Sequence, residues 1–99
     1  MNKFLYYNDL FNLYKELLTT KEKEIFALYY EENYSMGEIS ENLNISRSAV
    51  HNFLKKVEDK LTTYEDKLHL VKIKKTLRSI LEQEDSQKIK AEILNILEM

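Results

Sequence analysis

The sequence predicts an all-α fold, because two observations favour helices over strands. The 99 residues include no proline and one glycine, Gly37, so the turn residues that usually separate β-strands are missing. Apolar residues recur at intervals of three and four, which is the spacing of helices with one buried face. We expect a single helical domain over residues 1–99, in which a helix-turn-helix at about 35–61 precedes a long helix and a short C-terminal helix.

The first predicted helix, at about residues 3–18, is apolar on two sides. One row holds Phe4, Tyr7, Phe11, Tyr14 and Leu18, and the other holds Leu10, Leu13 and Leu17. Both rows must be buried, either centrally in the bundle or against a second subunit. Because a chain of 99 residues struggles to cover so much apolar surface alone, we expect a two-fold homodimer. Residues 3–18 and 63–98 are the candidate dimerisation elements.

A second helix is predicted to begin after Thr20, its expected N-cap. Lys23 stands where a capping box would have Glu or Gln, so this box is expected to be incomplete. Ile25, Leu28 and Tyr29 form the inner stripe of the helix. The seven tyrosines of the chain have helical spacing, which favours core and rim positions over base stacking.

The stretch "SMGEISENLNISRSAVHNFL", residues 35–54, predicts two helices joined by a tight turn. Ser35 and Glu38 form a capping box at the start of the first, which is about two turns long. Asn44 tolerates the left-handed backbone that ends a helix, and Ser46 is a good N-cap for the next. The second helix has one apolar stripe, made of Val50, Phe53, Leu54, Val57 and Leu61. This arrangement predicts a helix-turn-helix.

The opposite face of that second helix is polar, and it predicts contacts with double-stranded DNA. It shows Ser46, Arg47, Ser48, His51, Asn52, Lys55 and Lys56. The N-terminal part of such a helix lies in the major groove. There, serines reach phosphates, Arg47 suits a phosphate or guanine, Asn52 suits adenine, and His51 can donate to a phosphate or a base edge. The alternative interpretation is a solvated surface with no ligand.

The charge distribution supports the DNA interpretation. The chain has a formal net charge of −2, but residues 46–78 carry nine Lys or Arg against four acids, and no acid occurs between 42 and 57. The segments 1–45 and 79–99 are both acidic. A local basic field guides docking more than the total charge does. Lys60 would join Lys55 and Lys56 in contacting phosphates, while Glu58 and Asp59 would face away from the groove or mark its end.

A fifth helix is predicted from Thr62 or Thr63 to about residue 83, and a sixth at about 86–98 with Ser86 as its cap. The fifth has two apolar rows, as expected if it leaves one packing partner and joins another. Between these rows lies a secondary basic stripe, made of Lys67, Lys74, Lys75 and Arg78. Such a stripe is either solvated or binds an acidic protein surface or an RNA backbone.

The segment "LTTKEKEIFALYYEENYSMGEISENLNISRSAVHNFLKKVEDKL" resembles region four of bacterial sigma factors. With the flanks "FLYYNDLFNLYKELLT" and "YEDKLHL", the whole chain resembles the small YlxM-like proteins, a DNA-binding family encoded beside signal recognition particle genes. The resemblance implies an all-α fold, a homodimer and a regulatory link to the signal recognition particle pathway. Ala49 and Leu54 depart from many sigma domains, which carry more arginine in this helix, and strong promoter-type binding is therefore not expected.

Other classes of function have little support in the sequence. No cysteine is present, which excludes disulfides and thiolate metal sites, and we expect neither a metal nor a cofactor. Adjacent acids such as Glu31 and Glu32 point in different directions on a helix, so we expect no enzyme. No apolar run approaches the roughly 20 residues that span a bilayer, and no signal peptide is recognisable. We expect a cytoplasmic DNA-binding regulator, or alternatively a protein or RNA adaptor built on the same scaffold.

Overall fold

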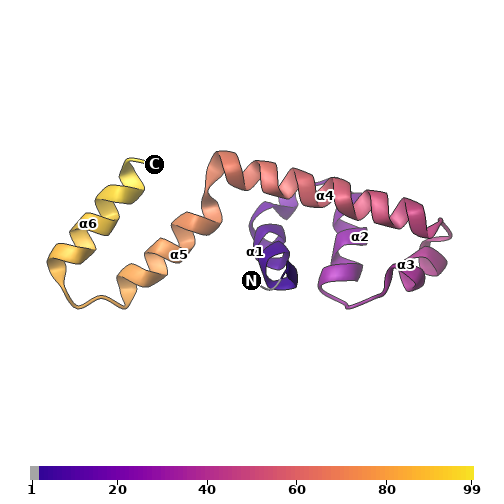
Figure 1. Cartoon of the computed structure of the whole chain (residues 1–99), viewed down its shortest axis with the longest axis horizontal. Helices are drawn as coiled ribbons and strands as arrows, with labels where there is room; N and C mark the ends of the chain where they lie inside the picture. Colours follow the sequence, from indigo (N-terminus) through magenta and orange to yellow (C-terminus); the bar gives the residue numbers. More distant parts are fainter. Residues whose placement is uncertain (1–2) are drawn as a thin grey trace. The chain divides into compact units, whose positions relative to one another are not determined.

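The computed structural model describes residues 3–99, which are helical and include no β-strand, so the predicted all-α fold is confirmed. The elements follow the chain in the order drawn in Figure 1. They are α1 (Lys3–Tyr14), the 3-10 helix η1 (Lys15–Leu17), α2 (Thr20–Tyr30), α3 (Met36–Leu43), α4 (Arg47–Leu68), α5 (Leu70–Leu81) and α6 (Ser86–Leu97).

The described chain divides into two compact units, one up to Lys67 and the other from Leu68 to Met99. The sequence predicted a single domain. The division falls beside His69, whose backbone is left-handed at φ 56° and separates α4 from α5.

The first unit has a dense apolar core. Its buried apolar side chains are Leu10, Phe11, Tyr14, Leu18, Ile25, Phe26, Tyr30, Ile39, Val50, Leu54, Val57 and Leu61. Aromatic rings join α1 to α2, since the ring centroid of Phe26 lies 5.0 Å from that of Phe11 and 4.3 Å from that of Tyr30. Tyr14 and Tyr30 lie in this core, which confirms for these two tyrosines the prediction of core positions. The long helix α4 lies across α1, α2 and α3 (Figure 1).

The start of α2 differs from the prediction. The N-cap is Thr19 and not Thr20, and its hydroxyl oxygen accepts a hydrogen bond from the amide of Glu22 at 3.2 Å. The Glu22 carboxylate in turn accepts from the Thr19 amide at 2.8 Å, which completes a capping box that was predicted to be incomplete. The first predicted helix also ends earlier, at Tyr14, and a 3-10 turn takes the chain to the extended Leu18.

The predicted boundary at Thr62 and Thr63 is wrong, because α4 runs through it to Leu68. Both hydroxyls donate to the backbone carbonyl one turn earlier, Thr62 to Glu58 at 2.8 Å and Thr63 to Asp59 at 2.9 Å. A threonine satisfied in this way continues a helix instead of capping one. The sequence therefore misplaced the end of α4 by about two turns.

The second unit is a hairpin of α5 and α6. Its sixth helix is capped by Asp85 and not by Ser86, since an Asp85 carboxylate oxygen accepts from the amide of Gln87 at 2.9 Å. Val71 is the one buried apolar side chain among residues 68–99. The hairpin therefore has almost no core of its own.

Candidate nucleic-acid interface

The helix-turn-helix is built as the sequence predicts. The Ser35 hydroxyl oxygen accepts from the Glu38 amide and the Glu38 carboxylate from the Ser35 amide, each at 3.0 Å. Asn44 has left-handed geometry, with φ 54° and ψ 47°. The Ser46 hydroxyl oxygen then accepts from the Ala49 amide at 3.0 Å and caps α4. An extra bond, from the Ser40 hydroxyl to the Ile45 carbonyl at 2.5 Å, fixes the turn between the two helices.

Three polar contacts on the inner side of α4 fix its orientation. The Tyr30 hydroxyl donates to the buried carboxylate of Glu58 at 2.6 Å. The Lys60 ammonium donates to the buried Glu22 carboxylate at 2.6 Å. Near the end of the helix, the Tyr14 hydroxyl donates to Glu65 at 2.6 Å. These contacts couple α4 to α1 and α2, so that its opposite face is held in one direction.

The charges of these contacts are tuned by their surroundings. Burial alone would raise the pKa of Glu22, but hydrogen bonds from Lys60 and Thr19 outweigh it, and the pKa of Glu22 lies below its ordinary 4.5. The hydrogen bond to Glu22 raises the pKa of Lys60. Burial, followed by the bond to Glu58, raises the pKa of the Tyr30 hydroxyl well above its ordinary value. The inner side of α4 thus keeps a charged pair and a neutral tyrosine at physiological pH.

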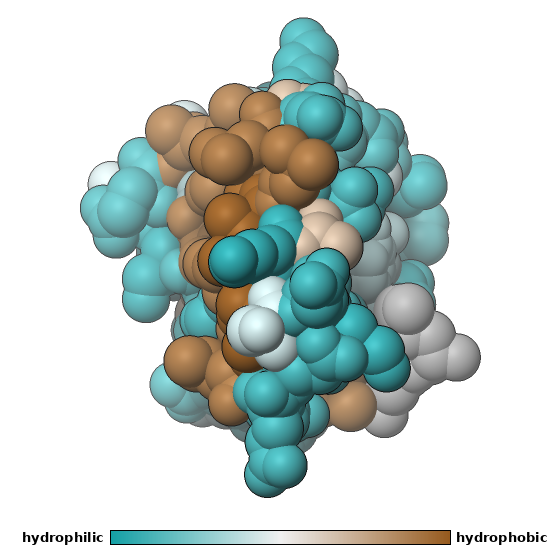
Figure 2. Space-filling view, turned by 90° about the vertical axis from the view of Figure 1, so that its left-hand side faces the viewer, coloured by the Kyte–Doolittle hydropathy of each residue, from teal (hydrophilic) through white to brown (hydrophobic). Residues whose placement is uncertain are grey.

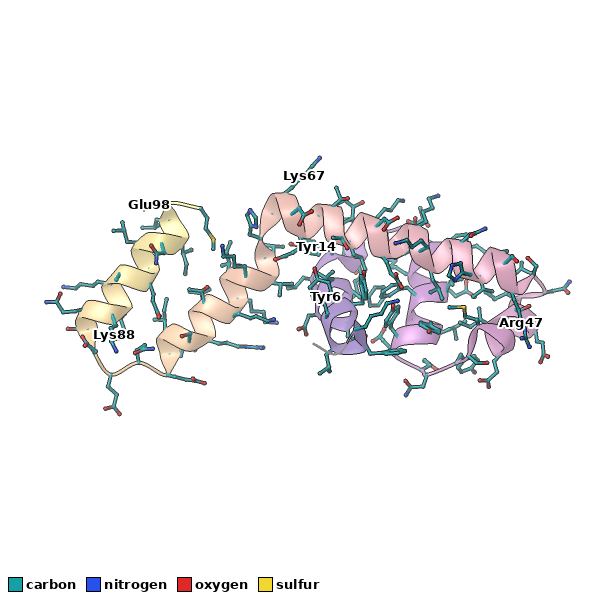
Figure 3. The ribbon with its side chains drawn as sticks, viewed as in Figure 1. Tyr6, Tyr14, Arg47, Lys67, Lys88 and Glu98 are labelled. Atoms are coloured by element: carbon teal, nitrogen blue, oxygen red, sulfur yellow. The ribbon has the colours of Figure 1, made fainter. Side chains whose placement is uncertain are left out.

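Each of the seven residues predicted to contact DNA is exposed. Ser46, Arg47, Ser48, His51, Asn52, Lys55 and Lys56 all lie on the outer side of the turn and of α4. Lys55 makes an ion pair with Asp59 at 3.3 Å, in which both side chains are about two-thirds exposed. Exposed pairs of this kind are weak, so Lys55 remains available to a polyanion. Figure 3 labels Arg47, which comes from the first turn of α4.

The structure adds residues that sequence reasoning did not include. A surface depression of about 570 Å³ is lined by Met36, Gly37, Arg47, Ser48, His51 and Asn52. Within it, the guanidinium group of Arg47 lies against Gly37 of α3. The signal that could have identified Gly37 is its position, because a lone glycine inside a helical pattern often has a packing reason.

A second depression continues along α4. It has a volume of about 500 Å³ and is lined by Asn52, Lys55, Lys56, Asp59, Lys60, Thr63 and Tyr64. Asn52 borders both depressions, so all the predicted residues except Ser46 form one continuous surface from the start to the middle of α4. Basic and amide side chains dominate this surface, and these are the groups that contact phosphates and base edges.

Two predictions about basic residues need correction. Lys60 was expected to contact phosphates, but its ammonium is bonded to the buried carboxylate of Glu22. The secondary stripe assumed one continuous helix, but the left-handed His69 lies between Lys67 on α4 and the other three members on α5. Lys67, Lys74, Lys75 and Arg78 are all exposed. Their placement on one helical face, however, no longer follows from the helical spacing.

Residues 3–99 contain no group of three or more His, Cys, Asp or Glu side chains placed to hold a metal ion. No helix in this part of the chain is long and apolar enough to cross a bilayer.

Comparison with known proteins gives consistent results. Residues 1–98 match the family UPF0122, described as "Putative helix-turn-helix protein, YlxM / p13 like". A UPF0122 protein of Thermoanaerobacter sp. (strain X514) is 43% identical, over 96% of this chain and 87% of its own length. One from Listeria monocytogenes serotype 4b (strain CLIP80459) is 39% identical, over 89% of this chain and 80% of its own. One from Caldanaerobacter subterraneus subsp. tengcongensis is 54% identical over 70% of this chain, and the match spans 59% of that relative's length.

Proposed function

The chain belongs to the UPF0122 family of YlxM/p13-like helix-turn-helix proteins, and from this premise we propose that it is a non-catalytic, cytoplasmic regulator that binds double-stranded DNA. The N-terminal part of α4 enters the major groove, and α3 crosses the backbone beside it. The observation that supports this most directly is that all seven predicted contact residues between Ser46 and Lys56 are exposed on the side that faces away from the core. A surface needed for packing would not leave these side chains open.

Each contact residue has a role that follows from its chemistry. Asn52, on the border of the two depressions, pairs with adenine through its amide. Ser46 and Ser48, short side chains at the start of the helix, allow close approach to phosphates. Lys55 and Lys56, two to three turns farther along, neutralise phosphates, and His51 donates to a phosphate or a base edge.

The test is a selection against random duplex DNA at two salt concentrations, followed by affinity measurements on the enriched site. We expect a recurring motif, and binding that weakens steeply with salt. Asn52→Ala should lose about 1–3 kcal/mol of discrimination at one base pair. The control is Asn12→Ala, which removes an exposed amide from α1 and should change nothing. A protein that binds no duplex in dilute buffer would contradict the proposal.

We further propose that two copies associate through the hairpin of α5 and α6. Eight of the large apolar side chains that the structure leaves exposed lie in this unit: Leu68, Leu70, Leu77, Leu81, Ile93, Leu94, Leu97 and Met99. Figure 2 looks onto the side of the hairpin where α6 lies and shows a band of apolar side chains bordered by hydrophilic ones. Exposed apolar surface of this extent is typical of an interface.

A second copy is the occupant that fits, because the hairpin is complementary to itself in charge. Residues 70–81 hold Lys72, Lys74, Lys75 and Arg78 and no acid, while the following turn holds Glu82, Glu84 and Asp85. An isologous two-fold pairing can bring the basic helix of one copy to the acidic turn of the other. A helical hairpin also provides half of a four-helix bundle, which supplies the core that one hairpin lacks.

Sedimentation at micromolar concentration tests the dimer and the element that forms it. We expect a dimer mass for the native protein and a monomer mass for Leu97→Glu, which charges a leucine that is 76% exposed. Leu5→Glu, at 64% exposure on α1, is the matched control and should remain dimeric. If Leu5→Glu alone dissociates the dimer, α1 is the interface, and a native monomer would contradict dimerisation altogether.

A second function rests on the exposed basic side chains of α5. Lys74, Lys75 and Arg78 are open in the structure and would suit an RNA backbone or an acidic protein. In this alternative the chain is an adaptor in the signal recognition particle pathway. Neutralising the three residues should then abolish binding to the particle's RNA or protein, whereas Asn52→Ala should have no effect. The opposite pattern is expected for the DNA-binding regulator.

A further inference from the structure

Gly37, the one glycine in the chain, is the second residue of α3. It does not have a positive φ, so its backbone conformation does not require glycine. Glycine inside a helix is less stable than alanine in the same place. The structure shows what its missing side chain permits: an added Cβ would lie 2.9 Å from Nη2, 3.2 Å from Cζ and 3.3 Å from Nε of Arg47. The guanidinium group occupies the space that a methyl group would take.

We propose that Gly37 is a positioning residue that holds the Arg47 guanidinium against the start of α3, so that Arg47 contacts a backbone phosphate and not a base. This inference rests on the proposed DNA binding. In a helix-turn-helix the first helix crosses the DNA backbone. Because the guanidinium group lies on that helix, it lies along the path of a phosphate strand, whereas Asn52, farther along α4, faces the groove. A planar guanidinium with paired donors suits a phosphate well.

The arrangement also reduces the cost of binding. An arginine side chain that must be ordered on contact loses rotamer freedom, and this loss weakens the complex. An arginine already held against α3 has lost part of that freedom before DNA arrives. Gly37 therefore acts on affinity through Arg47, although it lies on another helix and carries no side chain.

The first measurement uses the free protein. Gly37→Ala forces the guanidinium to move, which costs little because only the end of a flexible side chain shifts. Nitrogen-15 relaxation of the Arg47 Nε–H group should report restricted motion in the native protein and greater motion in Gly37→Ala. The melting temperature should stay equal or rise, since alanine favours the helix. Equal Arg47 mobility in the two proteins would overturn the positioning role, whether or not DNA binds.

The second measurement is affinity for the selected site and for an unrelated duplex, over a range of salt. Arg47→Ala should weaken binding to both duplexes alike, on the order of eightfold at 0.1 M salt for one lost phosphate contact. The slope of log K against log salt should fall by about 1. Gly37→Ala should show part of the same loss, and none in the Arg47→Ala background. Asn42→Ala, an exposed helix-favouring change in α3 outside the depression, is the control.

The outcomes separate the two proposals. If the native protein binds no duplex, the DNA-binding function and the phosphate contact both fail, while the relaxation measurement still decides whether Gly37 positions Arg47. If DNA binds and Arg47→Ala loses affinity only for the selected site, Arg47 reads a base and the phosphate assignment is wrong. If Gly37→Ala weakens binding equally with and without Arg47, it acts through the fold and the inference is overturned.

Discussion

The two units of the chain treat similar amphipathic sequences in opposite ways. From residue 3 to Lys67, twelve apolar side chains are buried and three large ones are exposed, Phe4, Leu5 and Leu17. From Leu68 onwards most large apolar side chains are exposed instead of buried, since only Val71 is buried and eight are exposed. The difference teaches that a regular apolar stripe predicts where a helix has an inner face, but not whether one copy of the chain can cover it.

The two units also differ in how far their polar side chains are buried. In the first unit, the hydroxyls and carboxylates of Tyr30, Glu58 and Glu22 lie in a core where an unpaired polar group is costly. These contacts select one orientation of α4 and therefore fix the surface that we propose binds DNA. In the hairpin the lysines and all the acids except the half-buried Glu92 remain exposed, where ion pairs contribute little. The first unit thus holds its outer polar surface in one direction, whereas the second leaves exposed the apolar surface that we propose for dimerisation.

The largest expected effect comes from the core of the first unit. Phe26→Ala removes a fully buried ring that stacks on Tyr30 and should destabilise the fold by about 3–5 kcal/mol. Leu81→Ala truncates a leucine that is 85% exposed, and should change the unfolding of the first unit very little. Urea denaturation followed by tyrosine fluorescence measures both, since the tyrosines all lie before residue 68. If Phe26→Ala and Leu81→Ala lost similar amounts of stability, the proposed contrast between the two units would be wrong.

A smaller loss is expected for the hydroxyl that satisfies a buried carboxylate. Tyr30→Phe keeps the ring but removes the donor to Glu58, and should cost about 1–3 kcal/mol. Tyr34→Phe, at a half-buried position after α2, is the control and should be nearly neutral. Urea denaturation of the two variants at neutral pH measures the difference. An unchanged stability of Tyr30→Phe would mean that the bond to Glu58 does not contribute to holding α4.

Acid should weaken the first unit through Glu22. Because the folded pKa of Glu22 lies below its ordinary 4.5, the carboxylate contributes stability above about pH 4.5 and loses it as the pH falls through the folded value. Lys60 stays protonated across this range. Urea denaturation at a series of pH values should therefore show a decline on the acid side. Glu22→Gln should be less stable at neutral pH and should show a shallower acid decline, and an unchanged pH profile would contradict the role of the pair.

The smallest effects should come from the helix caps. Ser46→Ala removes the oxygen that accepts from the Ala49 amide and should cost about 1 kcal/mol. Asp85→Ala removes the corresponding cap of α6. Hydrogen exchange should show faster opening at the start of α4 in the first variant and at the start of α6 in the second. If Ser46→Ala opened α6 as well, the two units would unfold as one.

Two of the three left-handed positions among residues 3–99, Asn44 and His69, illustrate what local pattern could and could not predict. Asn44 was predicted because asparagine tolerates this backbone and stands between two recognisable caps. His69 was not, because it lies inside an amphipathic run with no glycine, proline or cap to indicate an end. The caps at Thr19 and Asp85 were missed by one residue for a related reason. Adjacent polar residues offer equal local chemistry, and tertiary position decides between them.

The sequence by itself determined the all-α class, the helix-turn-helix with its turn, and the residues on the outer face of α4, because caps and apolar periodicity act over a few neighbouring residues. Only the tertiary structure decided that Lys60 pairs with Glu22, that Glu58 is buried against Tyr30, and that Arg47 lies on Gly37. These contacts join residues from different helices. Their geometry depends on how whole helices pack, and no local pattern of residues contains that information.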